Sequence, residues 1–310
     1  MIPGWALATR APFHLEATVR VLQRRPSNAV DVWHQGRYRR LLSLPNGPAL
    51  VEVENRGSIA DPEMRFCIRE GKTTFATRAA VRRALCRMLG LDVDPAPLWH
   101  LTEAERTFHN TARALRGMRP PRFASLFEAF ASVIPFQQLS LDAGVAIVGR
   151  LVAKFGEHLV YDSRRCYAFP TAHSIASARL ASLRACGLSA RKAQTLHDVA
   201  RAVESDGVTE ARLSGMSTNE ALRTLIAMPG IGPWSAGLVL LRGLGRLDVF
   251  PPGDIAAKRG VRALMRRGSQ APLEPIIERF GEHRGYLYFC ALGGSLLSKG
   301  LIHAAPDWRP

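Results

Sequence analysis

The stretch MPGIGPWSAG, residues 228–237, places Gly230 and Gly232 on either side of one isoleucine. Pro233 then suits the first turn of a helix. A glycine hairpin at a helix start leaves main-chain N–H groups uncovered, and both these donors and the helix dipole favour a phosphate. We therefore expect Gly230, Ile231 and Gly232 to contact a polyanion backbone. A tight structural turn would use the same two glycines, so the pattern alone leaves both interpretations open.

Asp254 is the second residue that can do chemistry. It follows Pro-Pro-Gly and begins a segment whose apolar residues, Ile255, Val261, Leu264 and Met265, have helical spacing. Aspartate is favoured as an N-cap, and the positive end of a helix keeps its carboxylate ionised. An ionised carboxylate can stabilise positive charge in a transition state, so the capping and catalytic roles are compatible.

Two helices must hold the hairpin. Ser217 and Glu220 have the spacing of a capping box, which predicts a helix over 218–227. The second helix begins at Pro233, where a proline is tolerated. The sequence therefore predicts a helix-hairpin-helix unit centred on 225–237.

The rest of the chain divides into two parts. Residues 1–95 mix strand and helix signals: ALVEVEN at 49–55 alternates apolar and polar residues, and 77–90 has helical spacing. A linker is expected at 91–99, and strand signals nearly vanish after residue 100. We predict an α+β protein, with a small antiparallel α/β domain over 1–95 and a mainly α-helical domain over 96–310.

The charge of the chain points to a polyanionic partner. Lysine and arginine number 42 against 26 aspartates and glutamates, which gives a formal net charge of +16 spread along the chain. Such a surface favours nucleic acid over generic solubility charge, because phosphate contacts release counterions. The five cysteines are widely spaced and contain no C-x-x-C pair, which argues against disulfides and structural zinc.

No segment reads as a targeting signal or a membrane span. The N-terminus lacks a charged lead followed by an apolar stretch, and the longest apolar run, 286–297, is well short of the ~20 residues that a span requires. We expect a cytoplasmic, nucleoid-associated protein without a membrane partner.

The hairpin, Trp234 and the Pro-Pro-Gly-Asp motif that ends at Asp254 together resemble the helix-hairpin-helix (HhH-GPD) DNA glycosylase superfamily. Within it, the resemblance is to the DNA-3-methyladenine glycosylase II branch, over roughly 120–300 and more weakly in the N-terminal part. The resemblance implies that Asp254 is the catalytic carboxylate, facing an oxocarbenium-like sugar as its base leaves. The implied activity is hydrolysis of the N-glycosidic bond of alkylated bases in duplex DNA, by a monomer acting in base excision repair.

Two positions bear on the type of reaction. Members with lyase activity place a lysine nucleophile where this chain has Trp234, and iron–sulfur members carry four cysteines after the aspartate, where only Cys290 follows. The resemblance therefore implies a monofunctional hydrolase that requires no cofactor and holds no iron–sulfur cluster. It also implies a monovalent cation on the main-chain carbonyls of Met228 and Ile231.

The resemblance also suggests DNA contacts outside the hairpin. The segment IPFQQLS, 134–140, is similar to the family segment that fills the gap left by a flipped base. Gln138 matches the wedge position, with Leu139 as the alternative, although a glutamine pair making local hydrogen bonds has the same appearance. Lys258 shares a helical face with Arg262 and Arg266 and can hold a phosphate or simply be solvated.

The implied base pocket combines aromatic and polar residues. Trp234 and Tyr286 would read the face of a cationic base, unless they belong to the core. Gln137 and His283 are the polar members, and a histidine at 283 departs from the usual family pattern. This departure leaves the substrate range open.

Two other functions remain open at this point. The first is a non-catalytic helix-hairpin-helix DNA-binding protein, in which Asp254 serves only as a helix cap. The second is an oxidised-base glycosylase with lyase activity, which Trp234 in the lysine position disfavours. Replacement of Asp254 separates the first from a glycosylase, and borohydride trapping of a covalent DNA adduct would reveal the second.

Overall fold

The computed structural model describes residues 3–104, 108–265 and 272–305. Its N-terminal part is built on a five-stranded antiparallel sheet with the strand order β1-β5-β4-β3-β2. Alternation places Phe66 and Ile68 in the core, while Arg65 and Arg69 lie on the other face. The predicted strand over 49–55 is confirmed as β4. The strands are β1 (Gly4–Ala6), β2 (Val32–His34), β3 (Arg37–Leu42), β4 (Ala49–Asn55) and β5 (Met64–Glu70).

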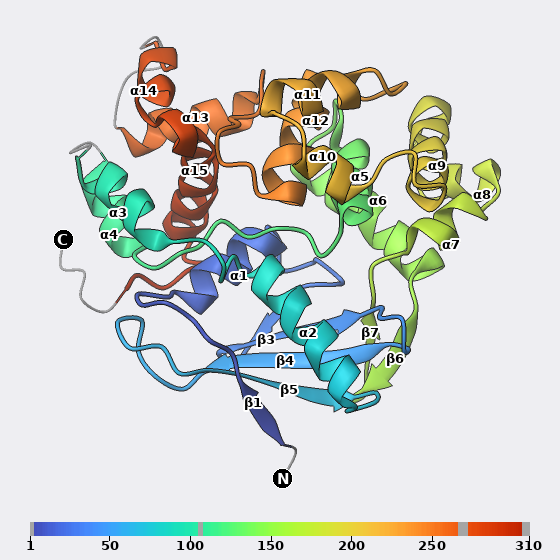
Figure 1. The fold of residues 1–310 in the computed structure, drawn as a ribbon, viewed down its shortest axis with the longest axis horizontal. Helices are drawn as coiled ribbons and strands as arrows, with labels where there is room; N and C mark the ends of the chain where they lie inside the picture. The colour runs from blue at the N-terminus through green and yellow to red at the C-terminus, as the bar shows by residue number, and fades with distance from the viewer. Residues whose placement is uncertain (1–2, 105–107, 266–271, 306–310) are drawn as a thin grey trace.

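Helices form most of the remainder of the molecule, with the five-stranded sheet at one end (Figure 1). No helix in the described ranges is long and apolar enough to span a bilayer. The helices before the hairpin are α1 (Leu15–Gln23), α2 (Phe75–Met88), α3 (Pro95–Ala104), α4 (His109–Ala114), α5 (Leu126–Val133), η2 (Ile134–Phe136), α6 (Leu141–Phe155), α7 (Ala172–Ala176), α8 (Leu180–Arg184), α9 (Ala190–Glu204), α10 (Glu210–Ser214) and α11 (Thr218–Ile226). Those after it are α12 (Pro233–Leu238), the π-helical η3 (Val239–Leu244), α13 (Ile255–Leu264), α14 (Glu274–Arg279), η4 (Gly281–His283) and α15 (Arg284–Ser298).

One helix and one β-hairpin contradict the sequence prediction. Helix α3 occupies much of the segment that was expected to be a linker at 91–99. Strands β6 (His158–Tyr161) and β7 (Arg164–Tyr167) form a hairpin in the part expected to be helical. Asp162 and Ser163 both adopt positive φ in its two-residue turn, and β7 packs beside β3 of the N-terminal sheet. The hairpin is thus stabilised by a long-range partner that local sequence patterns do not reveal.

Helix α2 begins earlier than its predicted start at residue 77. Thr74 is the N-cap, and its hydroxyl accepts a hydrogen bond from the Thr77 main-chain N–H at 3.1 Å. Gly90 follows the helix end at φ 61°, a left-handed conformation that suits glycine. One cluster of buried apolar side chains extends from Leu7 to Ile302, through the sheet and the helices alike. Since the core is continuous, the domain boundary at residue 95 stays a prediction.

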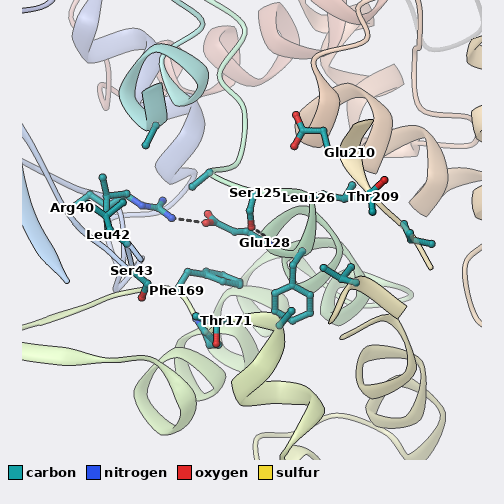
Figure 2. A pocket seen from close by; sticks show the side chains of 18 of the residues that line it. Arg40, Leu42, Ser43, Ser125, Leu126, Glu128, Phe169, Thr171, Thr209 and Glu210 are labelled. Carbon is teal, nitrogen blue, oxygen red and sulfur yellow. Dashed lines mark hydrogen bonds and ion pairs between the residues drawn. The ribbon is translucent and has the colours of Figure 1, made fainter. Parts of the chain in front are cut away.

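A cavity of about 500 Å³ lies where the sheet meets the helices, between β3, the start of α5 and the segments before α7 and α10 (Figure 2). Arg40 is almost fully buried on its wall and donates hydrogen bonds to Asp31 at 2.7 Å and to Glu128 at 2.5 Å. The Tyr38 hydroxyl donates to the same Asp31 carboxylate at 2.7 Å. This buried network joins the sheet to α5, because Asp31 and Arg40 come from the first part and Glu128 from the second.

Candidate active site

A separate cleft of about 650 Å³ brings together three segments that are distant in sequence. They are the turn between η2 and α6, the start of α9, and the hairpin followed by the starts of α12 and α13. The cleft is lined by Phe136, Gln137, Gln138, Leu139, Ser189, Arg191, Lys192, Gly230, Gly232, Pro233, Trp234, Ser235, Gly253, Asp254 and Ile255.

Asp254 is the N-cap of α13, as predicted, and only 8% of the residue is exposed. One carboxylate oxygen, Oδ1, accepts a hydrogen bond from the Ala257 main-chain N–H at 2.8 Å. The other, Oδ2, accepts one from the Trp234 indole N–H at 3.0 Å. Both donors stabilise the ionised carboxylate, and each oxygen still has a lone pair available. Asp254 is therefore held as a fixed negative charge on the cleft wall.

Ile255 corrects the predicted apolar face of α13. It is 72% exposed, whereas Val261 and Met265 are buried. Because Ile255 is the first residue after the cap, it lies at the rim of the cleft instead of facing the core.

Trp234 forms part of the cleft wall beside Asp254 and is partly buried against the core. Its indole N–H is engaged by the carboxylate, so the orientation of the ring is fixed. Trp234 thus both lines the cleft and packs against the core, and its role in reading a base stays a prediction.

Glycine occupies the two hairpin positions for different structural reasons. Met228 accepts a hydrogen bond from the Ile231 N–H at 3.1 Å, and Gly230 adopts φ 82°, as the third residue of a type II turn requires. A Cβ on Gly230 would also collide with Thr195 of α9. Gly232 has φ −93°, which any residue can adopt, and a Cβ there would meet no atom within 4 Å. Of the two glycines, only Gly232 has open space beside it in which a ligand could bind.

The turn that carries the predicted wedge is held from two sides. Gln137 donates from its side-chain amide to the Gly230 carbonyl at 2.9 Å and to the Ser235 hydroxyl at 3.0 Å. Lys192 donates to the carbonyls of Pro135 at 3.1 Å and Gln137 at 2.5 Å, and burial lowers the pKa of Lys192. Gln137 is consequently a brace between the turn and the hairpin.

Gln138 has φ 55°, a left-handed conformation that is uncommon for a residue other than glycine. Gln138 is exposed on the cleft, and the neighbouring Leu139 is 43% exposed. The bonds from Gln137 and Lys192 maintain this strained turn, which presents two adjacent side chains to solvent.

Several predicted site residues do not reach the cleft. Tyr286 is 7% exposed in the core, where its hydroxyl donates to the Met118 carbonyl at 3.4 Å and burial raises its pKa. His283 belongs to η4 and does not line the cleft. Lys258 is paired with Glu274 at 2.8 Å, and Arg266 lies outside the described residues. The predicted pocket roles of Tyr286 and His283 therefore have no support in this arrangement.

Ile231 and Met228 do not line the cleft either. The Ile231 side chain is buried. The Met228 carbonyl already accepts one hydrogen bond and retains one lone pair.

Sequence reasoning missed four residues that build the cleft or its supports. Thr195 leaves no room for a side chain at Gly230, and Lys192 donates to main-chain carbonyls of the turn that carries Gln138. The Ser235 hydroxyl accepts a hydrogen bond from Gln137, and Ile255 lies on the rim of the cleft. The capping pattern that begins at Ser189 predicts the start of α9, but nothing local shows that this helix approaches the hairpin.

Two family models match the chain. Residues 131–281 match the HhH-GPD superfamily base excision DNA repair protein, and residues 5–125 match the AlkA N-terminal domain. Residues 131–281 therefore belong to the HhH-GPD superfamily. The first match contains the turn at Gln138, the hairpin and Asp254.

Among curated proteins, the chain is similar to a DNA-3-methyladenine glycosylase of Bacillus subtilis, with 26% identity over 61% of this chain and 62% of the relative. It is also similar to a probable bifunctional transcriptional activator/DNA repair enzyme AlkA of Mycobacterium tuberculosis, with 28% identity over 98% of this chain and 58% of the relative. The matches thus span less than two thirds of these relatives. Among solved structures, a 3-methyladenine DNA glycosylase from Archaeoglobus fulgidus has a TM-score of 0.78 and 27% identity over 95% of this chain and 99% of that chain.

Proposed function

We propose that this chain is a monofunctional DNA glycosylase that hydrolyses the N-glycosidic bond of alkylated bases in duplex DNA during base excision repair. The observation that carries this proposal is the state of Asp254, a carboxylate held by two N–H donors on the wall of an open cleft. The similar proteins of Bacillus subtilis and Archaeoglobus fulgidus, both named as 3-methyladenine DNA glycosylases, support the same substrate class.

Binding would begin at the hairpin. Gly232 is the N-cap of α12 and has no side-chain cap, so the first N–H groups of that helix are free to receive a phosphate. With one strand anchored there, Gln138 or Leu139 can occupy the gap that an extruded base leaves in the stack. Both side chains are exposed on the turn that Gln137 ties to the hairpin.

The chemistry follows from the fixed charge of Asp254. As the C1′–N bond breaks, the electron pair leaves with the base and positive charge develops on the sugar, which the carboxylate stabilises. A water then adds to C1′ and loses its proton, leaving an abasic site. A free lone pair on Asp254 can orient that water.

The single acidic group of the cleft favours a cationic base. Asp254 is the sole carboxylate among the described residues that line it, whereas protonation of a neutral leaving group requires a second acid. A 3- or 7-alkylated purine already carries a positive charge and leaves as a neutral molecule. The tethered Trp234 ring can add cation–π attraction.

Lyase chemistry is disfavoured by the same geometry. Trp234 stands where a nucleophilic lysine would be, and the Lys192 ammonium is engaged by two carbonyls. An amine that donates in this way is not a free nucleophile.

We further propose a monomer that works in the cytoplasm on the nucleoid, with duplex DNA containing damaged bases as its partner. We also propose a structural monovalent cation on the main-chain carbonyls of Met228 and Ile231; the Met228 carbonyl accepts one hydrogen bond within the turn and retains a lone pair. No catalytic step requires this cation, and none requires an iron–sulfur cluster.

Base release from a panel of duplexes tests the proposal. The duplexes carry 3-methyladenine, 7-methylguanine, hypoxanthine, uracil or 8-oxoguanine, and release is compared with the uncatalysed rate for each lesion. The cationic bases should show the largest rate enhancements, with no adduct trapped by borohydride. Enhancement only for 8-oxoguanine, with a trapped adduct, would replace the proposal by the lyase alternative.

A further inference from the structure

The outer surface of α2 carries an aromatic and cationic patch that the cleft does not use. We define the patch as Trp5, Phe75, Arg78, Arg82 and Arg83, which line a shallow hollow of about 530 Å³ together with Ala79. Helix α2 and the adjoining strand β1 are both visible at the front of the molecule in Figure 1. None of these residues lines the cleft.

Phe75 is the most unusual member of the patch, because 81% of it is exposed. It is the first residue of α2, whose N-terminus is already capped by Thr74. The core is contacted instead by Val81, Leu85 and Met88 on the opposite face of the helix. Phe75 therefore neither caps the helix nor packs in the core, and the fold does not explain why its phenyl ring is exposed to solvent.

The positive charges of the patch have few acidic neighbours. The segment 71–91 contains five lysines and arginines and no aspartate or glutamate. Arg82 and Arg83 are exposed, and within the described ranges neither has an ion-pair partner. Arg78 stacks over the Trp5 ring at 5.4 Å, and its Nε has no hydrogen-bond partner.

We propose that this patch binds single-stranded DNA without sequence preference, as a second nucleic-acid site distinct from the cleft. Aromatic rings stack with unpaired bases of any sequence, while neighbouring arginines contact the phosphates. A duplex keeps its bases stacked inside, so it would engage the arginines and leave Phe75 unused. An arginine already stacked on Trp5 extends the platform beside Phe75.

Fluorescence anisotropy with a labelled short oligothymidylate tests the proposal on the full chain. Phe75→Ala keeps every charge and should weaken binding on the order of tenfold, the typical value of one stacked base. Phe75→Ala combined with Arg82→Ala and Arg83→Ala should weaken it further. Base release from a lesion-containing duplex should be unchanged in both variants, so failure of this site and failure of the proposed activity are separable.

The matched control is Arg179→Ala with Arg184→Ala, which removes two exposed arginines around α8. Oligothymidylate binding by this control should stay close to that of the parent chain. Equal losses in the control and the patch variant would overturn the proposal, because binding would then reflect general charge. Unchanged binding in Phe75→Ala would also overturn it. So would patch-dependent binding to phosphatidylserine vesicles without binding to the oligonucleotide, since the patch would then recognise a lipid surface.

Discussion

The cavity between sheet and helices and the cleft beside the hairpin are similar in size but different in chemistry. In the cavity, Arg40 is enclosed between Asp31 and Glu128. Three of the hydroxyls that line it are helix caps, those of Ser125, Thr171 and Thr209. The cleft instead exposes Gln138 and Ile255 around a carboxylate. The volume of a hollow is thus a poor guide to function. Polar groups that remain accessible to a ligand are a better one.

The largest expected effect is on stability, at the cavity. Arg40→Ala leaves the carboxylates of Asp31 and Glu128 buried without their cation, which should lower the free energy of unfolding by about 3–5 kcal/mol. Urea denaturation measures this loss. Asp206→Asn, on the wall of the same cavity, is the control and should change the free energy by less than about 0.5 kcal/mol. If Arg40→Ala proved as stable as this control, the network would not join the two parts.

Trp234→Phe tests the bond to Asp254, because it keeps an aromatic ring and removes the indole N–H that donates to the carboxylate. Loss of a hydrogen bond to a charged group costs about 1.5–3 kcal/mol. Single-turnover base release should therefore slow by about tenfold to a hundredfold, with duplex affinity nearly unchanged. An unchanged rate would show that the Trp234–Asp254 bond plays no part in the reaction.

The two hairpin glycines offer a matched pair. Gly230→Ala introduces both strain at φ 82° and a collision with Thr195, and should lower the free energy of unfolding by about 1–3 kcal/mol. Gly232→Ala should leave stability within about 0.5 kcal/mol of the parent and weaken duplex binding instead. Denaturation and binding titrations on both variants check this division. Equal effects of the two changes on stability would contradict it.

The smallest expected effect is on the melting temperature and concerns Lys258. Its ammonium forms an ion pair with the Glu274 carboxylate, as Arg40 does with the carboxylates in the cavity. Lys258 lowers the pKa of the exposed Glu274 carboxyl to about 2. The pair therefore adds stability above the usual carboxyl pKa and loses it as pH falls through about 2. Melting temperatures of the parent and Lys258→Gln should differ slightly at neutral pH and converge in acid. A difference that grew in acid would refute this pairing.

Local patterns predicted the elements whose cause is local. The capping box at Ser217, the strand 49–55 and the cap at Asp254 are all readable from neighbouring residues, and the structure has each of them. The reason for Gly230 was only half readable: its turn follows from Pro229, but Thr195 lies far away in sequence.

The errors at the site arise from long-range packing. The sequence does not show whether a tyrosine such as Tyr286 lines a pocket or packs in the core. Its hydroxyl reaches the Met118 carbonyl only because the fold brings these distant segments together. The bond from Trp234 to Asp254 and the brace from Gln137 likewise depend on where separate segments meet.

The most direct test of the proposed activity is single-turnover release of 3-methyladenine from a duplex by Asp254→Asn, with duplex affinity measured on the same preparation. Asparagine preserves the helix cap while removing the negative charge. We expect release to fall on the order of a hundredfold to a thousandfold, with duplex binding retained. Release at the parent rate would contradict this expectation, because Asp254 would then be only a helix cap.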